Sequence, residues 1–343
     1  MAGTNSAPGA SRTVVIGVNW LGDTIMSLPA LCTLRKWLSE EDIHVVCPSS
    51  LVELVRMAQV ADHVWGWPKG TRRRIRLLKS LRAQRAILFP NSFRSAWIAF
   101  WAGVPKRWGY AGQWRDLLLD PSVPASRRPK AAHHSEIYLE LLKAMGWKGE
   151  KAAVHLRIPP EAQQWALGRI GKSMSGRCLI GICPGAAYGP AKIWPPERFV
   201  AVARGLMRSH RAKVILLGNS LERDVAAGMA HELGRDALNL AGLTDLPKLA
   251  ALISRCDLIL CNDSGPMHLA AVLGVPVVAV FGSTDPSATA PMGPHRIASV
   301  GLPCSPCFRR RCPEGHNRCL LDIRVEDVLE AAQELLEFRD GCP

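Results

Sequence analysis

Short apolar runs alternate along the chain with segments in which apolar residues recur every three or four positions. Residues 23–38, for example, follow the spacing of one helix face. Alternation of this kind is typical of parallel, doubly wound sheets, and the pattern restarts after a break near Pro159-Pro160. The expected strands are 13–18, 44–48, 63–67 and 86–90, followed by 179–184, 213–218, 257–262 and 275–282.

The restart predicts an α/β protein with two Rossmann-like domains whose parallel sheets face each other. Residues 104–134 are rich in Pro, Gly and Arg and are expected to be irregular. The chain has no run of about 18 apolar residues, so we expect no membrane-spanning helix. We assign 1–11 to a disordered tail, 12–160 to the first domain, 175–325 to the second, and 326–343 to a C-terminal helix and tail.

One turn in the second half stands out as a candidate ligand site. The run 258–262 ends in Asn-Asp-Ser-Gly, and a helical pattern begins at Pro266. Ligands of open α/β sheets bind at the carboxyl ends of strands, and free amides at a helix start favour an anion. Asp263 and His268 add a carboxylate and an imidazole. The same residues also fit a plainer interpretation, in which Asp263 or Ser264 caps the helix and His268 packs in the core.

Two further loops of the second half, 185–192 and 218–222, follow predicted strands. Lys192 could reach a diphosphate as a point charge, and Glu222 could accept hydrogen bonds from ribose hydroxyls. For each residue alone, a surface position or a helix cap is the better interpretation. Three loops at successive strand ends together favour a ligand that contains a nucleotide.

Two nucleotide-binding motifs are missing from the sequence. G-x-G-x-x-G does not follow the first strand of either half, and G-x-x-x-x-G-K-[ST] is absent. The absences count against nicotinamide, flavin and phosphate-loop ATPase functions, and we expect no cofactor.

Asp23 is the candidate for chemistry in the first half. It closes the loop 17–22 and opens a helix, so one interpretation is a helix cap. If the two sheets face each other, the carboxylate instead lies opposite the nucleotide loops. There it could take a proton from an attacking hydroxyl, an effect typically worth about 10²–10⁴ in rate.

The net charge of +14 is unevenly distributed. Residues 1–160 carry 23 Lys or Arg against 11 Asp or Glu, whereas 161–343 carry 20 against 18. The basic segment 72–82 reads as an amphipathic helix, and Arg94 lies close in sequence to Trp97, Phe100 and Trp101. This composition suits an anionic membrane surface or a phosphorylated lipid. No nucleic-acid motif accompanies the charge, so we expect no nucleic-acid partner.

Eleven cysteines occur in a chain without an export signal, which indicates reduced thiols in the cytoplasm. Four of them are clustered with the spacing C-x₂-C-x₄-C-x₆-C. We expect free thiols in an ordered loop and no catalytic metal. The alternative is a structural zinc ion held by four thiolates, those of Cys304, Cys307, Cys312 and Cys319.

Four motifs resemble the lipopolysaccharide heptosyltransferases, and within that family the heptosyltransferase II type. They extend over nearly the whole chain after the tail, and the Cys-rich segment is closer to the second heptosyltransferase than to the first. The motifs are Asn19-Trp20-Leu21-Gly22-Asp23, the segment from Pro184 to Pro195, Asn262-Asp263-Ser264-Gly265-Pro266-Met267-His268, and Cys304-Ser305-Pro306-Cys307 through Cys319.

The resemblance implies a GT-B fold with the acceptor on the N-terminal domain and ADP-heptose on the C-terminal domain. It implies inverting transfer without a catalytic metal, with Asp23 as the base and Lys192 at the donor phosphates. Glu222 would contact the ribose and Asp263 the heptose. The implied donor-binding residues are Gly185, Lys192, Glu222, Asp263, Ser264, Gly265 and His268, and the implied acceptor-binding residues are Asn19, Trp20, Gly22 and Arg94.

The implied reaction moves L-glycero-D-manno-heptose from ADP-heptose to the inner-core heptose of heptosyl-Kdo2-lipid A. The enzyme would be cytoplasmic, in peripheral contact with the inner membrane where its phosphorylated acceptor lies. A heptosyltransferase I type, or a transferase of another nucleotide sugar, is the nearest alternative. A nucleic-acid-binding protein and a zinc-dependent protein are alternatives from other classes.

Overall fold

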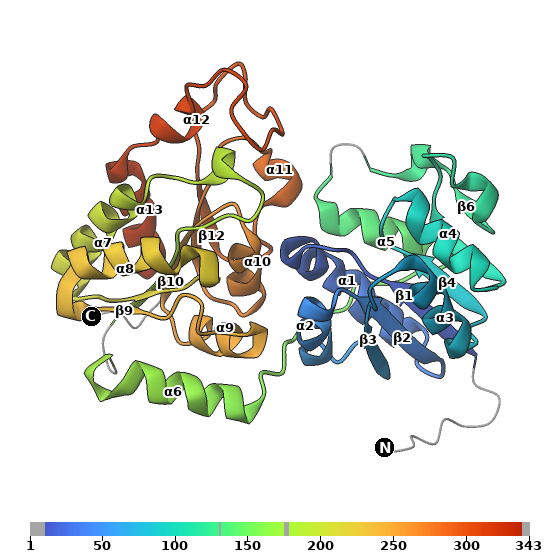
Figure 1. Ribbon diagram of the computed structural model, residues 1–343. Coiled ribbons are helices and arrows are strands. Elements are labelled where there is room, and N and C mark those ends of the chain that lie inside the picture. The colour runs from blue at the N-terminus through green and yellow to red at the C-terminus, as the bar shows by residue number, and fades with distance from the viewer. Residues whose placement is uncertain (1–10, 130–131, 175–177, 338–343) are drawn as a thin grey trace. The chain divides into compact units, whose positions relative to one another are not determined.

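The computed structural model describes residues 11–129, 132–174 and 178–337 (Figure 1). The expected N-terminal tail lies outside the described residues except for Ser11, as does the expected C-terminal tail after residue 337. The chain forms two compact units, residues 1–157 and 158–343. The pair Pro159-Pro160 leads directly into a helix of the second unit.

The first unit contains a sheet of six parallel strands in the order β3-β2-β1-β4-β5-β6. The four expected apolar runs are confirmed as β1 to β4. Buried strands between two layers of helices need apolar residues on both faces, which explains the continuous runs. The strands are β1 (Arg12–Ile16), β2 (Asp42–Cys47), β3 (His63–Gly66), β4 (Arg85–Leu88), β5 (Lys106–Tyr110) and β6 (Ser122–Val123).

The expectation that residues 104–134 are irregular is wrong in part, because they contain β5 and β6. Neither strand has an apolar run of its own: β5 reads Lys-Arg-Trp-Gly-Tyr, and β6 is two residues long. Both are strands only because β5 pairs with the buried β4 and β6 pairs with β5. Tertiary pairing thus decides their structure where local pattern does not.

Five α-helices and three short 3₁₀ turns connect the described strands of the first unit. A buried cluster joins α3 and α4 to β1 and β4, while α1 packs against α5. Helix α1 begins at Leu21, so Asp23 lies within its first turn and the cap position is Trp20. The helices are α1 (Leu21–Trp37), η1 (Ser49–Leu51), α2 (Val52–Met57), α3 (Thr71–Leu81), α4 (Phe93–Trp101), η2 (Asp116–Leu118), η3 (Ala125–Arg127) and α5 (His134–Ala144).

The second unit repeats the architecture with six parallel strands in the order β12-β11-β10-β7-β8-β9. The four expected runs are confirmed as β7, β8, β10 and β11, and the outermost strands β9 and β12 were not expected. Each outer strand is three or four residues long and only partly buried, so it carries no strong apolar signal. The strands are β7 (Leu179–Cys183), β8 (Lys213–Leu216), β9 (Ala237–Asn239), β10 (Leu258–Asn262), β11 (Val277–Val280) and β12 (His295–Ala298).

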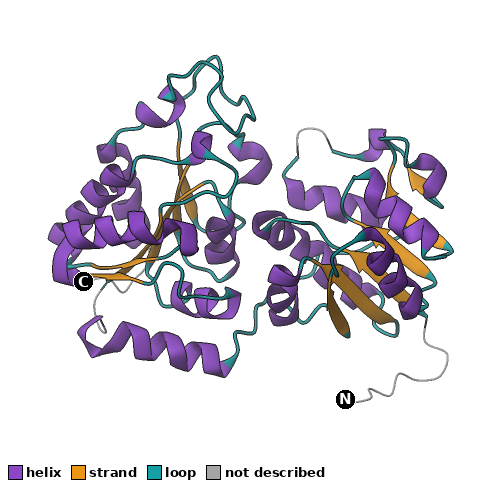
Figure 2. Cartoon of the chain, viewed as in Figure 1, coloured by secondary structure: helices purple, strands orange, loops and turns teal. Residues whose placement is uncertain are grey.

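Helices α7, α8 and α13 pack side by side in the second unit, and α10 packs against β10 and β11 (Figures 1 and 2). The expected last helix is confirmed as α13, which contacts β10, β11 and β12. Among the described helices, none combines the length and the apolar character that crossing a membrane requires. The helices are α6 (Pro160–Met174), η4 (Pro190–Lys192), α7 (Pro196–His210), η5 (Ser220–Glu222), α8 (Arg223–Leu233), η6 (Gly234–Asp236), α9 (Leu246–Ile253), α10 (Gly265–Val272), α11 (Pro286–Thr289), α12 (Arg318–Leu321) and α13 (Val325–Glu337).

The two sheets have the same topology, because numbering the strands from one within each unit gives the order 3-2-1-4-5-6 both times. The strand order reverses between β1 and β4 in the first unit and between β7 and β10 in the second. Ligands of open α/β sheets bind at the carboxyl ends of the strands at such a reversal. The loops after these four strands are therefore where a functional site is expected.

Candidate active site

Asn262, the last residue of β10, holds the loop that follows β7. Its fully buried Nδ2 donates to the carbonyl of Pro184 at 2.6 Å, and its Oδ1 accepts from the backbone N–H of Trp194 at 3.0 Å. Pro184 and Trp194 lie on either side of the loop that carries Lys192. One side chain therefore fixes both ends of that loop, and its own buried polar atoms are satisfied in doing so.

Lys192, Asp263 and Thr284 meet at the carboxyl ends of the central strands. The Lys192 ammonium donates to Oδ2 of Asp263, and the Thr284 hydroxyl donates to the same oxygen. The side chains of Lys192 and Asp263 are 12% and 5% exposed, so each charge depends on the other. The Lys192 Nζ also lies 4.7 Å from the ring centroid of Tyr188. The arrangement holds an ammonium group, paired with a carboxylate, at the carboxyl ends of the strands.

The segment 304–319 packs over these loops. The Tyr188 hydroxyl donates to the carbonyl of Phe308 at 2.7 Å, and the Phe308 N–H donates to the carbonyl of Ser283 at 2.7 Å. Phe308 thereby joins the loop after β7 to the loop after β11. The Cys-rich segment supports the same loops that carry Lys192 and Thr284.

The four clustered cysteines are free thiols in the structure. Cys312 accepts from the backbone N–H of Asn317 at 3.4 Å, and this and neighbouring backbone amides lower the pKa of the Cys312 thiol. The Cys304 sulfur lies 3.9 Å from Nε2 of His316. Burial raises the pKa of the Cys319 thiol, and the three neighbouring thiols raise it further. The expectation of free thiols without zinc therefore stays a prediction, and so does the alternative of a structural zinc ion.

Glu222 contacts the backbone at the ends of β7 and β8. A Cβ on Gly185 would clash with Oε1 of Glu222 and one on Gly218 with Oε2, so a larger residue at either position would have to displace this carboxylate. The carboxylate accepts from the Asn219 N–H at 2.8 Å and forms a capping box for η5. Burial raises the pKa of this carboxyl. The cap interpretation of Glu222 is therefore correct structurally, and it places the carboxylate beside Gly185.

Helix α10 begins at the reversal of the strand order. Ser264 is its N-cap residue but makes no side-chain cap bond, and its buried Oγ has no hydrogen-bond partner among the described residues. Gly265 and Pro266 form the first turn, and His268 is buried in the next. The turn therefore does not use the expected alternative in which a side chain caps the helix.

The loops after β1 and β4 of the first unit line a cavity of about 240 Å³. Asn19, Trp20 and Asp23 contribute from the first loop and from α1, as the sequence predicts for one site. The buried Oδ1 of Asn91, after β4, has no hydrogen-bond partner among the described residues. The full lining is Val18, Asn19, Trp20, Asp23, Phe89, Pro90, Asn91, Arg128, His134, Ile137 and Tyr138.

Asp23 and Tyr138 both line this cavity. Burial raises the pKa of the Tyr138 hydroxyl, and the negative charge of Asp23 raises it further. Burial lowers the pKa of His134, and His133 and Arg128 add to that shift. The cavity thus holds a carboxylate next to a phenol that stays protonated at neutral pH, which suits binding and deprotonation of a hydroxyl compound.

Some residues lie where the sequence did not suggest. Gly22 and Arg94 are absent from the lining of the cavity, and Arg94 is exposed on α4. Sequence reasoning missed Thr284 and Tyr138. Thr284 could have been found, because Ser283 and Thr284 are the first hydroxyl residues after the apolar run 275–282. Tyr138 has no such signal, since only the packing of α5 on α1 brings it to Asp23.

A sequence model of the family Glycosyltransferase family 9 (heptosyltransferase) matches residues 74–317. The chain belongs to this family. Lipopolysaccharide heptosyltransferase 2 of Salmonella typhimurium is 32% identical, and the match covers 95% of this chain and 98% of that protein. The Escherichia coli protein of the same name is 31% identical, with the same coverage.

Solved structures agree with the assignment. The structure of E. coli ADP-heptose LPS heptosyltransferase II is 29% identical, with a TM-score of 0.81 and coverage of 96% of this chain and 99% of that one. E. coli heptosyltransferase WaaC with ADP, at 17% identity, is similar in fold, with a TM-score of 0.69 and coverage of 94% and 99%. The expected α/β fold with two parallel Rossmann-like sheets of the GT-B type is confirmed, and so is the expectation of a glycosyltransferase.

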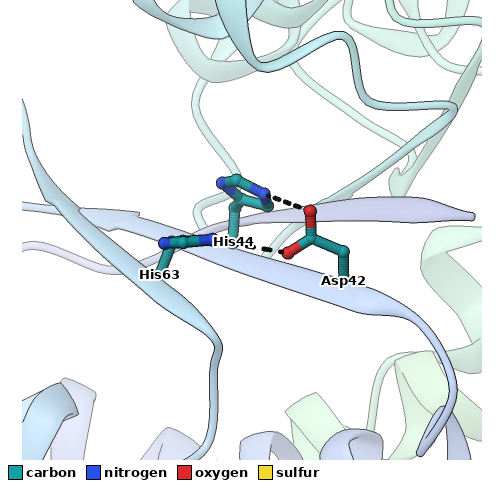
Figure 3. A group of neighbouring side chains, drawn as sticks. All are labelled: Asp42, His44 and His63. Atoms are coloured by element: carbon teal, nitrogen blue, oxygen red, sulfur yellow. Dashed lines mark ion pairs between the residues drawn. The ribbon is translucent and has the colours of Figure 1, made fainter. Parts of the chain in front are cut away.

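A second polar cluster in this glycosyltransferase lies at the start of β2 and β3, where Asp42, His44 and His63 point toward one another (Figure 3). Their ligand atoms lie within 4.8 Å of one another, as in groups that bind divalent metals. The Trp65 indole N–H, however, donates to Nδ1 of His44 at 3.0 Å. Indole is a donor only, so neutral His44 carries its proton on Nε2, 3.1 Å from Asp42 Oδ2.

Proton placement and a neighbouring cation make the cluster a polar network around the Arg12–Asp42 ion pair. A metal would need the lone pair of His44 Nε2, where the Trp65 contact places the proton. Arg12 Nε also donates to Asp42 Oδ2 at 2.9 Å. Burial raises the pKa of Asp42, but the contacts with His44 and Arg12 outweigh it and leave that pKa lowered. Burial lowers the pKa of His44.

We expect Gly185→Ala to weaken sugar-donor use without unfolding the protein. The new Cβ would occupy the place of Glu222 Oε1, and the flexible carboxylate can move away. The KM for the sugar donor should rise severalfold, while the melting temperature stays within about 2 °C of the wild type. The control is Gly228→Ala on α8, where a Cβ meets no atom within 4 Å. An unchanged KM for the sugar donor in Gly185→Ala would show that Glu222 does not take part in donor binding.

His44→Gln should flatten the pH dependence of stability. Because the folded pKa of His44 is lowered, the unfolded chain binds more protons below its ordinary value of about 6.5. The free energy of unfolding should therefore fall as pH decreases from 7 toward 5. The variant should lose part of that slope, and His134 should retain the rest. Urea unfolding at several pH values measures the free energy of unfolding, and His155→Gln at an exposed position is the control. Equal slopes in the wild type and in His44→Gln would contradict a lowered pKa of His44.

Proposed function

We propose that this chain is an inverting glycosyltransferase that moves L-glycero-D-manno-heptose from ADP-heptose to the inner-core heptose of heptosyl-Kdo2-lipid A. Relatives named lipopolysaccharide heptosyltransferase 2, 31–32% identical over 95% of the chain, support the substrate class. The observation that carries the proposal is the Lys192–Asp263–Thr284 group at the strand reversal of the second sheet. It supplies a held cation where a sugar diphosphate needs one.

In the proposed complex, the second unit binds the donor. Lys192 contacts the diphosphate, exchanging part of its pairing with Asp263 for the phosphate oxygens. Asp263, so released, accepts hydrogen bonds from heptose hydroxyls, and Glu222 accepts from the ribose beside Gly185. The start of α10 contributes its free amides to the diphosphate, with Ser264, Gly265 and His268 lining it.

In the proposed reaction, the first unit supplies the base. Asp23 takes the proton of the acceptor hydroxyl while that oxygen attacks the anomeric carbon of the donor. The bond from that carbon to ADP breaks on the opposite face, so the configuration inverts. Asn19, Trp20, Gly22 and Arg94 are the proposed acceptor contacts, and of these Asn19 and Trp20 line the cavity.

Negative charge grows on the departing ADP in this reaction. Lys192 and the start of α10 stabilise that charge, and the loss of one such donor typically costs about 3–4 kcal/mol. No step requires a metal, because the leaving diphosphate has a protein cation and helix amides. The acceptor is a lipid, so we place the enzyme in the cytoplasm, in peripheral contact with the inner membrane. Among its partners we propose no nucleic acid.

Mass spectrometry of the product tests the proposal as a whole. Purified protein, ADP-heptose and truncated lipopolysaccharide with one inner-core heptose should give a product heavier by one heptose. The same product should form at an equal rate with EDTA present. Product on heptose-free Kdo2-lipid A alone would indicate a heptosyltransferase I type. Product only with another nucleotide sugar would overturn the donor, and loss of turnover in EDTA would overturn the metal-free mechanism.

Asp23→Asn should lower kcat by about 10²–10⁴ with little change in donor KM, because the amide cannot accept the proton. The side chain keeps its size, so the cavity keeps its shape. Glu40→Gln, the same change at an exposed position beyond the far end of α1, should retain full kcat. Steady-state kinetics at saturating donor gives both values. Near-normal turnover of Asp23→Asn would remove the base assignment.

A further inference from the structure

Helix α4 exposes an aromatic face to solvent. Phe93, Trp97, Phe100 and Trp101 lie at positions i, i+4, i+7 and i+8, so they share one side of the helix. Each is between 39% and 56% exposed. Their rings contact one another, with centroids 5.7 Å apart for Phe93 and Trp97 and 5.5 Å apart for Trp97 and Trp101. Four adjoining exposed aromatic residues on nine positions are unusual for a surface that meets only water.

The neighbouring turn extends this surface. Turn η2 packs against α4, and Leu117 in it is 87% exposed, as is Trp114 just before it. Arg107 stacks over the ring of Phe100 at 5.5 Å. Tryptophan and arginine together are typical of residues that lie at a boundary between apolar and charged surroundings.

The charge around α4 is predominantly positive, although turn η2 contributes the exposed Asp116. Residues 63–115 contain twelve Lys or Arg and no Asp or Glu. Helix α3, which packs beside α4, exposes Arg72, Arg73, Arg76 and Lys79 (Figure 1). No carboxylate within this stretch neutralises them. A partner for this surface must therefore be both apolar and negatively charged.

We propose that the aromatic face of α4, with Trp114 and Leu117, enters the interface of an anionic phospholipid bilayer, while the cations of α3 contact its headgroups. Aromatic and aliphatic side chains stabilise a protein in the acyl boundary, and clustered arginines attract anionic lipid. Acidic proteins would satisfy the cations but not the exposed tryptophans. A second copy of the chain would bring like charges together.

Helix α4 begins next to the candidate acceptor cavity. Phe89, Pro90 and Asn91, which line that cavity, lead directly into α4. Resting on the function proposed above, docking of α4 keeps the lipid part of the acceptor in the bilayer while its sugar enters the cavity beside Asp23. The surface thus favours acceptors that are presented at a membrane.

Co-sedimentation with vesicles tests the surface without any substrate. Wild-type protein should bind vesicles of phosphatidylglycerol and phosphatidylcholine at least about tenfold more tightly than pure phosphatidylcholine, and raised salt should weaken that binding. Trp97→Ala with Trp101→Ala should weaken it about tenfold or more, and so should Arg72→Glu with Arg73→Glu. Brominated lipids should quench tryptophan fluorescence in the wild type and much less in the aromatic variant.

Matched controls lie in the second unit, where Leu243→Ala with Leu321→Ala, and Arg208→Glu with Arg235→Glu, change exposed residues of the same kind. They should bind vesicles as the wild type does. Equal binding by all variants would overturn the proposal. A dimeric wild type that the aromatic variant makes monomeric, with vesicle binding unchanged, would also overturn it and identify a second copy as the occupant. If the aromatic variant does not fold, vesicle binding by the variant Arg72→Glu with Arg73→Glu tests the proposal instead.

Transfer to a water-soluble, delipidated acceptor separates this proposal from the proposed function. The docking variants should keep that activity and lose activity on acceptor embedded in vesicles. Absence of transfer to either acceptor in the wild type, with vesicle binding intact, would overturn the function and leave the surface standing. Full activity of the variants on embedded acceptor would overturn the surface and leave the function standing.

Discussion

The two hydrogen bonds of the Asn262 amide are the constraint on which the second unit's site depends. The residue ends β10, one of the two central strands, where it pairs with Val280 of β11. Its side chain transmits the rigidity of the strand to the loop after β7. Lys192 is therefore held against Asp263 by the sheet itself. A loop with one end free would have to order its ammonium at the moment of ligand binding, at a cost in conformational entropy.

The two units place side chains of opposite charge at the same position of the sheet, which is the point where the strand order reverses. At the reversal of the first sheet the chain places a carboxylate, Asp23, beside the phenol of Tyr138. At the reversal of the second it places an ammonium, Lys192, on a buried carboxylate. The strand order fixes where a ligand site forms, and the loop residues decide its chemistry. One fold used twice can in this way hold a carboxylate in one unit and an ammonium in the other.

Much of this could be predicted from the sequence, and the failures share a cause. The eight apolar runs are strands, because a strand buried on both faces must be apolar along its length. β5, β6, β9 and β12 were missed because edge and short strands lack that requirement. Helix α1 starts two residues before Asp23, since Trp20 takes the cap position without offering a side-chain acceptor. By itself Glu222 looked more like a helix cap than a ligand contact, and the capping box confirms its part in the cap while a ligand contact stays a prediction.

By itself, the sequence determined two α/β units, the loops at their strand ends and most residues in those loops, because each follows from patterns within about ten neighbouring residues. Only the tertiary structure decided which of these residues meet. One carboxylate oxygen of Asp263 accepts hydrogen bonds from both Lys192 and Thr284, which lie far from each other in the chain. They meet because β7, β10 and β11 are adjacent strands. Tyr138 reaches Asp23 only through the packing of α5 on α1. Such contacts depend on strand order and helix packing, which are properties of the whole chain and leave no mark on a local stretch.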